Sequence, residues 1–228
     1  STATNFIITN GGNVGVGTTS PTQKLDVAGN INIGNTYAYK YNGSNVITAQ
    51  TTLDNYFFGN SGNLTMTGNE NTASGFQALL SNTTGYDNTA IGDNALYSNT
   101  TGNYNTSNGA YALYSNTTGW GNTIIGRNTL YSNTTGYNNT VLGAQSLFDL
   151  NITANDGSGN NTAIGYNTGG GIITGINNTI LGANVTGLSA TLSNNIILAD
   201  GAGNQRINVD NLGAVGISSS TPWASFAI

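Results

Sequence analysis

The chain has 228 residues, of which 33 are glycine and only 6% are charged, and its formal net charge is −5. Glycine and asparagine, both abundant here, are unfavourable inside helices, so the composition argues against a helical protein and favours an all-β fold rich in turns. The four basic residues are scattered, which excludes nucleic acid as a partner because phosphate binding requires clustered Lys and Arg. No stretch approaches the roughly 18 apolar residues of a membrane helix, so no membrane insertion is expected in this segment.

The two ends of the chain carry related segments. Residues 12–29 read GNVGVGTTSPTQKLDVAG, and residues 214–228 read AVGISSSTPWASFAI. A shift of 201 residues aligns them without a gap, so that Gly15 matches Gly216 and Pro21 matches Pro222. We therefore expect a β connector module at 1–33 and the start of a second one at 201–228, in a chain that is a piece of a longer modular protein.

Residues 34–70 precede a series of repeats. They are expected to form a β segment with a turn at Asn42-Gly43 that leads into the first repeat. The repeats start with Asn-Thr-x-x-Gly and have a constant period of 17, except for one step of 22 that contains the polar insertion NITANDGSGN. The eight copies are NTASG at 71–75, NTAIG at 88–92, NTSNG at 105–109, NTIIG at 122–126, NTVLG at 139–143, NTAIG at 161–165, NTILG at 178–182 and NIILA at 195–199. Eight units of fixed period identify a repeat architecture.

A period of 17 suits one coil of a parallel β-solenoid, which we predict for residues 71–200. In the coil that starts at Asn88, residues 89–91 are expected to form a first strand, residues 95–97 a second strand, and residues 98–102 a polar turn. Stacking such coils places identical residues above one another at about 4.8 Å. The predicted columns are Ile91, Ile125, Leu142, Ile164, Leu181 and Leu198; Leu79, Leu96, Leu113, Leu130 and Leu147; Tyr97, Tyr114, Tyr131 and Phe148; and Asn88, Asn105, Asn122, Asn139, Asn161, Asn178 and Asn195. Asn108 stands where its neighbours carry Ile or Leu.

Adjacent apolar residues recur in the strands, as in Ile124-Ile125 and Val141-Leu142. Because neighbouring side chains on a strand point to opposite faces, one of each pair lies outside a single solenoid. A second apolar column needs a cover, and self-association provides one. We therefore expect an oligomer of several chains.

The NTAIG…ALYSNTTG units resemble the head repeats of trimeric autotransporter adhesins, and the connector at 12–29 resembles segments of phage tail fibres and of mosaic adhesive trimers. The resemblance implies a left-handed β-roll or β-helix, a homotrimer, and an extracellular location on a cell surface or virion fibre. It also implies attachment to a cell-surface glycan or protein receptor. The coil, with its period of 17, is longer than is usual in these adhesins, which leaves a two-sided and a three-sided coil open.

Catalysis is not expected, and neither a metal nor a cofactor is predicted. The chain has no His and no Cys, which removes the commonest general base and the usual transition-metal ligands. The only acid pairs worth considering for a glycan-cleaving enzyme are Asp87 with Asp93 and Asp149 with Asp156, and all four residues belong to turns, where Asp is common. DGSGN at 156–160 and DGAGN at 200–204 carry too few acids for calcium and are interpreted as turns.

The candidate ligand-binding residues are Tyr86, Trp120 and Tyr137, which follow the turn glycine of their coils, as does Asn103. Aromatic side chains on an edge loop can stack on sugar rings, although packing against the neighbouring loop is the simpler role. An alternative function is an ice- or surface-binding solenoid. Its flat array would consist of the threonine pairs 83–84, 100–101, 117–118 and 134–135.

Overall fold

The computed structural model describes residues 6–29, 38–41, 44–50, 52–152 and 159–218; the predicted turn at Asn42-Gly43, Asp156 and residues 219–228 lie outside them. The described residues form strands and turns but no helix, which confirms the all-β class, and thus include no helix that could cross a membrane. Contacts divide the chain into two compact units, Ser1–Tyr37 and Ala38–Ile228.

The strands are short, and most contain three residues. In chain order they are β1 (Phe6–Ile8), β2 (Val14–Val16), β3 (Leu25–Val27), β4 (Ala38–Tyr41), β5 (Ser44–Gln50), β6 (Asn55–Phe58), β7 (Thr72–Ser74), β8 (Thr89–Ile91), β9 (Thr106–Asn108), β10 (Thr123–Ile125), β11 (Thr140–Leu142), β12 (Thr162–Ile164), β13 (Thr179–Leu181), β14 (Ile196–Ala199), β15 (Gln205–Val209) and β16 (Val215–Ile217).

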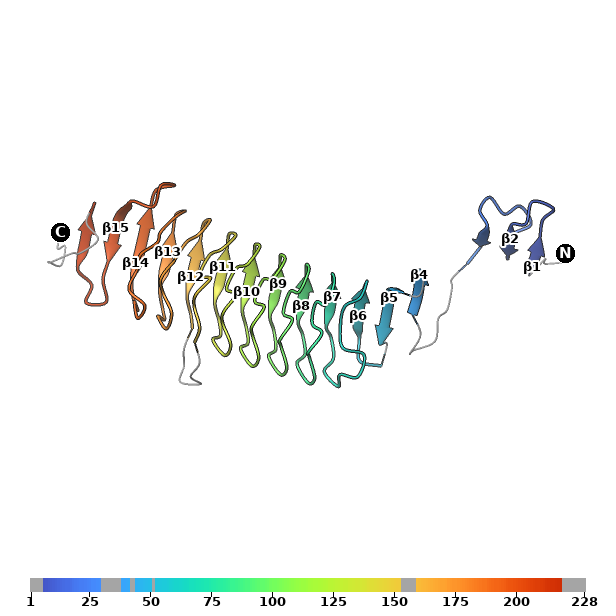
Figure 1. Ribbon diagram of the computed structural model, residues 1–228, viewed down its shortest axis with the longest axis horizontal. Helices are drawn as coiled ribbons and strands as arrows, with labels where there is room; N and C mark the ends of the chain where they lie inside the picture. The colour runs from blue at the N-terminus through green and yellow to red at the C-terminus, as the bar shows by residue number, and fades with distance from the viewer. Residues whose placement is uncertain (1–5, 30–37, 42–43, 51, 153–158, 219–228) are drawn as a thin grey trace. The chain divides into compact units, whose positions relative to one another are not determined.

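The first unit is a three-stranded sheet in the order β1-β2-β3, with β1 antiparallel and β3 parallel to β2. The second unit is built on one sheet of thirteen strands that follow one another in chain order from β4 to β16. Its first pairings, β4 with β5 and β5 with β6, are antiparallel; all pairings from β6 to β14 are parallel, and the last two, β14 with β15 and β15 with β16, are antiparallel. The stacked parallel coils of a β-solenoid, about eight in number, are therefore confirmed (Figure 1). Segments 34–70 and 201–228 contribute strands to the same sheet as the repeats.

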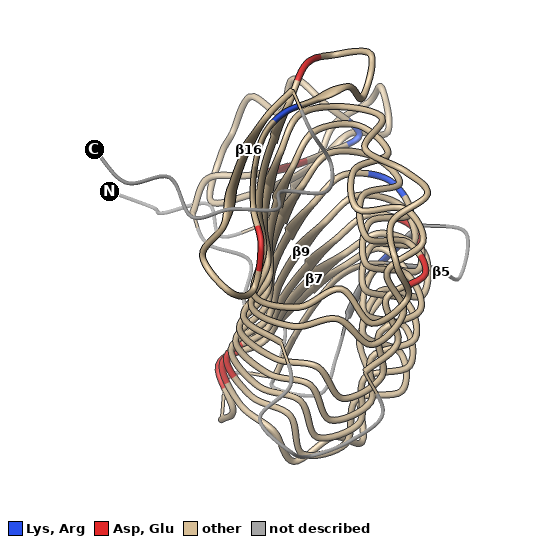
Figure 2. Cartoon of the chain, turned by 90° about the vertical axis from the view of Figure 1, so that its left-hand side faces the viewer, with Lys and Arg blue, Asp and Glu red and all other residues tan. Residues whose placement is uncertain are grey.

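The coils stack with the period that the sequence predicts. Thr89 lies opposite Thr106 and Ala90 opposite Ser107, so each residue pairs with its equivalent one repeat later. Across the longer step, Thr140 lies opposite Thr162, so the register of the strands is the same before and after the insertion. Figure 2, a view along the stack, shows the coils nearly superimposed and almost free of charged residues.

The middle residue of each coil strand points into the solenoid. Ala90, Ile124 and Val141 are at most 1% exposed, whereas Ile125 and Leu142, one position later, are 42% and 44% exposed. The column that contains Ile125 therefore lies on the outer face of the sheet. Asn108 belongs to this outer column and is exposed, so its polar side chain does not enter the core.

The second predicted strand, residues 95–97, is wrong. Residues 93–98 form consecutive turns in which Asn94 (φ 55°) and Leu96 (φ 52°) adopt the left-handed conformation. The segment still bonds to the next coil, since the Leu96 amide donates to the Ala112 carbonyl at 3.1 Å. The left-handed residue turns the Leu96 side chain inward, where it is fully buried. A left-handed residue other than glycine costs about 1–2 kcal/mol, which burial of the leucine offsets. Each coil thus has one regular strand, and its remaining sides are made of turns.

The aromatic column is confirmed. Tyr97, Tyr114, Tyr131 and Phe148 stack in sequence, with ring centroids 5.0–5.2 Å apart and interplanar angles of 3–12°. The rings lie along the outside of the turn segment, while the leucine column beneath them is buried.

The predicted asparagine column is also confirmed, and a second one accompanies it. In the first, the Asn88 Nδ2 donates to the Asn71 Oδ1 at 3.1 Å, and the pattern repeats to Asn178. The second, which we did not predict, consists of Asn82, Asn99, Asn116 and Asn133, whose side chains are fully buried and bond at 2.8–3.2 Å. Residues 82–84, 99–101, 116–118 and 133–135 each read Asn-Thr-Thr, and the side-chain amides of these asparagines lie inside the solenoid.

Candidate binding surfaces

The predicted ligand-binding aromatics lie on the turn edge of the coils and contact one another in pairs. Trp120 and Tyr137 stack with centroids 4.7 Å apart and an interplanar angle of 10°, and Trp120 is 44% exposed. Tyr86 instead packs edge to face against Tyr104, and their ring centroids are 5.1 Å apart. Asn103 separates the two pairs, and its Oδ1 accepts a hydrogen bond from the Tyr86 amide at 3.0 Å. Packing between neighbouring coils accounts for these contacts, and ligand binding by these residues stays a prediction.

A second aromatic surface, on the turn segment, was only partly predicted. Beside the stacked column lies a shallow pocket of about 390 Å³, lined by Tyr111, Arg127, Asn128, Tyr131 and Phe148. We call the space lined by these five residues the Arg127 pocket. The ring of Tyr111 packs against that of Tyr114, with ring centroids 5.8 Å apart, and so extends the aromatic surface beyond the stacked column. The repeat period places Tyr111 one coil before Asn128, so the proximity of Arg127 to Tyr111 was implicit in the sequence.

The Arg127 pocket combines a positive charge with neutral rings. Arg127 is exposed and has no carboxylate partner; within the described ranges the one ion pair joins Asp200 and Arg206. In the stacked column beside the pocket, burial and then the neighbouring rings of Tyr131 and Tyr97 raise the pKa of the Tyr114 phenol. A guanidinium group binds a carboxylate through two parallel hydrogen bonds, and aromatic faces pack on apolar surfaces of a ligand. The arrangement suits a small acidic ligand with an apolar face.

The outer face of the parallel sheet is the largest regular surface. We call it the sheet face, and it consists of the first and third residues of each coil strand. The first residues are Thr72, Thr89, Thr106, Thr123, Thr140, Thr162 and Thr179, and the large apolar third residues are Ile91, Ile125, Leu142, Ile164 and Leu181, which are 36–44% exposed. The sheet face from β7 to β13 therefore carries a threonine column beside an apolar column, and no charged residue.

The threonine pairs predicted for an ice-binding array lie elsewhere, in the polar turns. The Thr83 hydroxyl donates to the Thr100 carbonyl at 2.9 Å, and that of Thr100 to the Thr117 carbonyl at 3.0 Å. The first hydroxyl of each of these pairs is thus used within the stack. The threonine column of the sheet face is longer, with seven members.

Asp87, of the first predicted acid pair, interacts with the carboxyl group of Glu70, one coil earlier. A hydrogen bond that the protonated Glu70 carboxyl donates to Asp87, and then the negative charges of Asp87 and Asp54, raise the pKa of Glu70. These three acids occupy the same position of successive coils, before a buried asparagine, and all have φ near +55°. Asp156, of the second predicted pair, lies outside the described residues.

The DGAGN segment forms a turn, as interpreted from the sequence. The Asp200 carboxylate accepts hydrogen bonds from the amides of Ala202 and Asn204, both at 3.0 Å, and from the side chains of Asn204 and Arg206. The Asn204 side chain, and then Arg206, holds the pKa of Asp200 well below its usual range. In the part of the chain that the structure covers, no three metal-ligating side chains come together.

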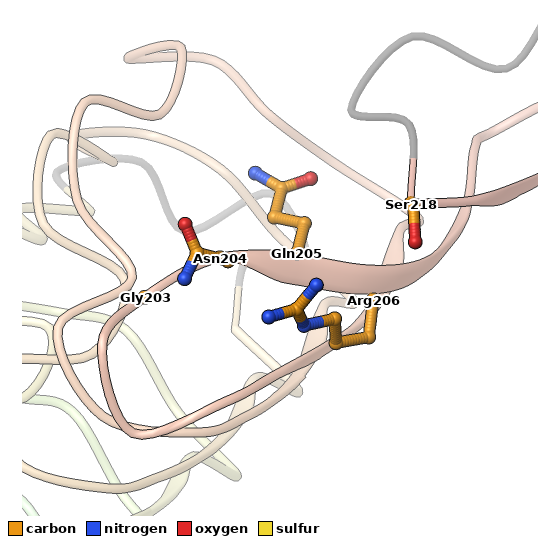
Figure 3. Close-up of a pocket in the computed structure, with 5 residues that line it drawn as sticks. All are labelled: Gly203, Asn204, Gln205, Arg206 and Ser218. Carbon is orange, nitrogen blue, oxygen red and sulfur yellow. The ribbon is translucent and has the colours of Figure 1, made fainter.

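A polar pocket of about 510 Å³ lies beside this turn and is lined by Gly203, Asn204, Gln205, Arg206 and Ser218 (Figure 3). The Arg206 guanidinium is already paired with Asp200. The counterpart of Ser218 in the first unit, Gly17, lies against Ala28, which follows β3. In the first unit, the position equivalent to this pocket is thus next to the chain that follows the third strand. We assign the pocket no ligand.

Comparison of the chain with protein-family models, with curated proteins and with solved structures gave no match.

Proposed function

We propose that the chain is a homotrimeric, left-handed β-solenoid segment of an extracellular fibre, of the adhesin or tail-fibre type. In this proposal it mediates attachment on a cell surface or virion and has no catalytic role. The observation that carries it is the apolar column of the sheet face. Ile125 and Leu142 lie opposite each other in adjacent strands and are both more than two-fifths exposed. Contiguous apolar surface of this kind is rare on a protein that works alone.

Three chains that turn their sheet faces toward a common axis would cover this column. The covering needs no change in the coil, because the core of each chain is closed by the inward residues, such as Ile124. The sheet face lacks charges, so burying it between subunits does not require a charged group to leave water. The turn edges, with the Arg127 pocket and the pair of Trp120 and Tyr137, would remain outside and available to a receptor.

The Arg127 pocket supports the attachment role. The rings of Tyr131 and Phe148 beside an unpaired guanidinium match an acidic saccharide, whose carboxylate would meet Arg127 and whose ring would lie on an aromatic face. The matched variants are Arg127→Gln, which removes the charge, and Arg206→Gln, whose guanidinium is already paired with Asp200. Binding to an array of acidic and neutral glycans should fall for the first variant and persist for the second.

Light scattering on a sizing column tests the assembly. A trimer has three times the mass of the single chain, which is 23.3 kDa. A monomer at micromolar concentration would contradict the proposal and leave the sheet face exposed to solvent.

The seven threonines of the sheet face favour a second candidate function, which is binding to ice or another regular surface. Neighbouring threonines in the column are about 4.8 Å apart, and the apolar column runs about 6.6 Å beside it. Such a flat lattice of hydroxyl and methyl groups is available only if the sheet face is not buried between subunits. This candidate would be supported if the protein is a monomer that shows thermal hysteresis and if the Thr123→Tyr variant loses that hysteresis. A trimer without thermal hysteresis would exclude it.

A further inference from the structure

The two ends of the chain contain the same β-hairpin. The shift of 201 residues that aligns the connector segments converts each pair of the first hairpin into a pair of the second. The pairs are Phe6–Val16, Ile7–Gly15 and Ile8–Val14 in the first, and Ile207–Ile217, Asn208–Gly216 and Val209–Val215 in the second.

The turns of the two hairpins agree as well. In the first, the Gly12 amide donates to the Thr9 carbonyl at 2.8 Å; in the second, the Gly213 amide donates to the Asp210 carbonyl at 3.0 Å. Both glycines have positive φ, 71° and 81°. Since the sequence of β1 differs from that of β15, the agreement in register and turn marks one structural module that is used twice.

The two hairpins differ in what lies beside their first strand. Strand β15 pairs antiparallel with β14, the last strand of the solenoid, so that Val209 faces Ile196 and Ile207 faces Leu198. Strand β1 is the edge of its sheet. In the first hairpin, the Thr9 amide donates a hydrogen bond to the Asn13 carbonyl. Because the amides of an antiparallel strand point alternately to the two sides, the amides of Phe6 and Ile8 point away from β2.

The exposure of the side chains reflects this difference. Phe6 and Ile8 are 60% and 63% exposed. Their counterparts beside β14 are less so: Ile207 is 37% exposed and Val209 is half-buried. Strand β1 has the sequence Phe-Ile-Ile, without the charge or proline that protects exposed sheet edges.

We infer that the edge of β1 is a docking site for the last strand of another β-solenoid of this type, which pairs with it antiparallel as β14 pairs with β15. The incoming strand has the chemistry of β14, an apolar Ile-Ile-Leu-Ala segment, with its first residue opposite Ile8 and its third opposite Phe6. The first unit is therefore the closing cap of a preceding solenoid, just as β15 and β16 close the solenoid of this chain. The inference does not depend on trimer formation or on a receptor.

A chimera tests the inference. Residues 205–228 are replaced by a copy of residues 4–27, so the chain keeps 228 residues, and the product is compared with the unaltered chain and with a chain that ends at Asn204. Hydrogen exchange is measured at β14. Removal of the cap should speed exchange at β14 by about tenfold or more, because an unpaired edge strand opens locally. The chimera should exchange like the unaltered chain, and exchange at the rate of the shortened chain would overturn the inference.

A crosslink checks the register and shows whether a failed chimera has merely unfolded. The chain has no cysteine, so Ile197→Cys can be combined with a cysteine in the copied hairpin. The expected partner is the copied Ile7, because its counterpart Asn208 faces Ile197. A disulfide should form between Cys at position 197 and Cys at the copied Ile7, but not with Cys at the copied Ile8. The controls are two double variants of the chain with its own hairpin: Ile197→Cys with Asn208→Cys, which should crosslink, and Ile197→Cys with Val209→Cys, which should not. A crosslink that prefers the Ile8 position, or none in a chimera whose far-ultraviolet circular dichroism is unchanged, would contradict the docking.

Discussion

Asn122 donates two hydrogen bonds to a single oxygen of Asn105: its backbone amide reaches Oδ1 at 3.1 Å and its Nδ2 at 3.0 Å. The second hydrogen of the Asn122 Nδ2 reaches the Gly136 carbonyl at 3.0 Å, and its Oδ1 accepts the same pair of bonds from Asn139. Each buried amide is thus satisfied by the coils on either side. A shift of one residue between coils would break every one of these bonds, so the ladder fixes the register of the stack.

Asn122→Ala should destabilise the protein by about 2–3 kcal/mol, because it leaves the buried backbone and side-chain amides of Asn139 without their acceptor. The free energy of unfolding in guanidinium chloride measures the effect. Asn60→Ala is the control, since Asn60 is exposed, and it should change the value by less than about 0.5 kcal/mol. Equal effects of the two variants would contradict the role of the ladder.

Leu113→Gly should be no less stable than Leu113→Ala. Leu113 is fully buried with φ of 52°, so both variants lose the packed side chain, at a cost of about 2–5 kcal/mol. Glycine adopts positive φ without strain, which recovers about 1 kcal/mol relative to alanine. The control is the same pair of changes at Ile124, a buried strand residue, where glycine should be the worse of the two. Thermal unfolding of the four variants decides the point.

Glu70→Gln should raise the melting temperature at pH 7 and have little effect near pH 4. Folding raises the pKa of Glu70 from 4.5, so the folded chain binds this proton more tightly than the unfolded chain. The stability that results is present below the ordinary pKa and is lost as the pH rises through the raised value. Glutamine removes the repulsion from Asp87 and should flatten the pH dependence from 4.5 upward. Asp149→Asn, on a different turn, serves as the control and should leave that slope in place.

Leu142→Lys should dissociate the proposed trimer without unfolding the coil, because Leu142 points out of the solenoid and is 44% exposed. Three ammonium groups would otherwise be buried together. Light scattering should give the mass of one chain, with an unchanged circular dichroism spectrum. Thr118→Lys places the same charge on an exposed polar turn and should leave the trimer intact. A trimer that survives Leu142→Lys would place the subunit contact elsewhere.

The coil stack was predictable because a short and constant period has one simple structural explanation, in which Thr89 lies on Thr106. The strand expected at 95–97 was wrong for a physical reason. The apolar run Ala95-Leu96-Tyr97 is typical of a strand, and no pattern of residue types indicates a leucine with positive φ. The leucine column was correct, but the backbone that supports it could not be read from side-chain types.

The surfaces were less predictable than the fold. In a pair such as Ile124-Ile125, both residues are apolar, so the sequence does not tell which one faces outward; the structure places Ile125 outside. The Arg127 pocket was missed because Arg127 was considered as an isolated charge rather than by its position in the coil. Buried Asn99 and Asn116 had the same period as the first asparagine column and could have been found by the same argument.

The hydrogen bonds between coils have a mechanical consequence. They join each turn of the solenoid only to its neighbours, as in the bond from the Thr106 amide to the Asn122 carbonyl, and they run along the length of the stack. Tension applied to the two ends of the chain therefore loads the coils in series, and the outermost yields first. Each coil that comes free lengthens the molecule by about 50 Å, because the extended segment spans about 58 Å and the folded coil about 5 Å. In the proposed attachment role, such a stack would yield in steps under a sudden pull and spread the force over time, which would spare the contact at its tip the peak load.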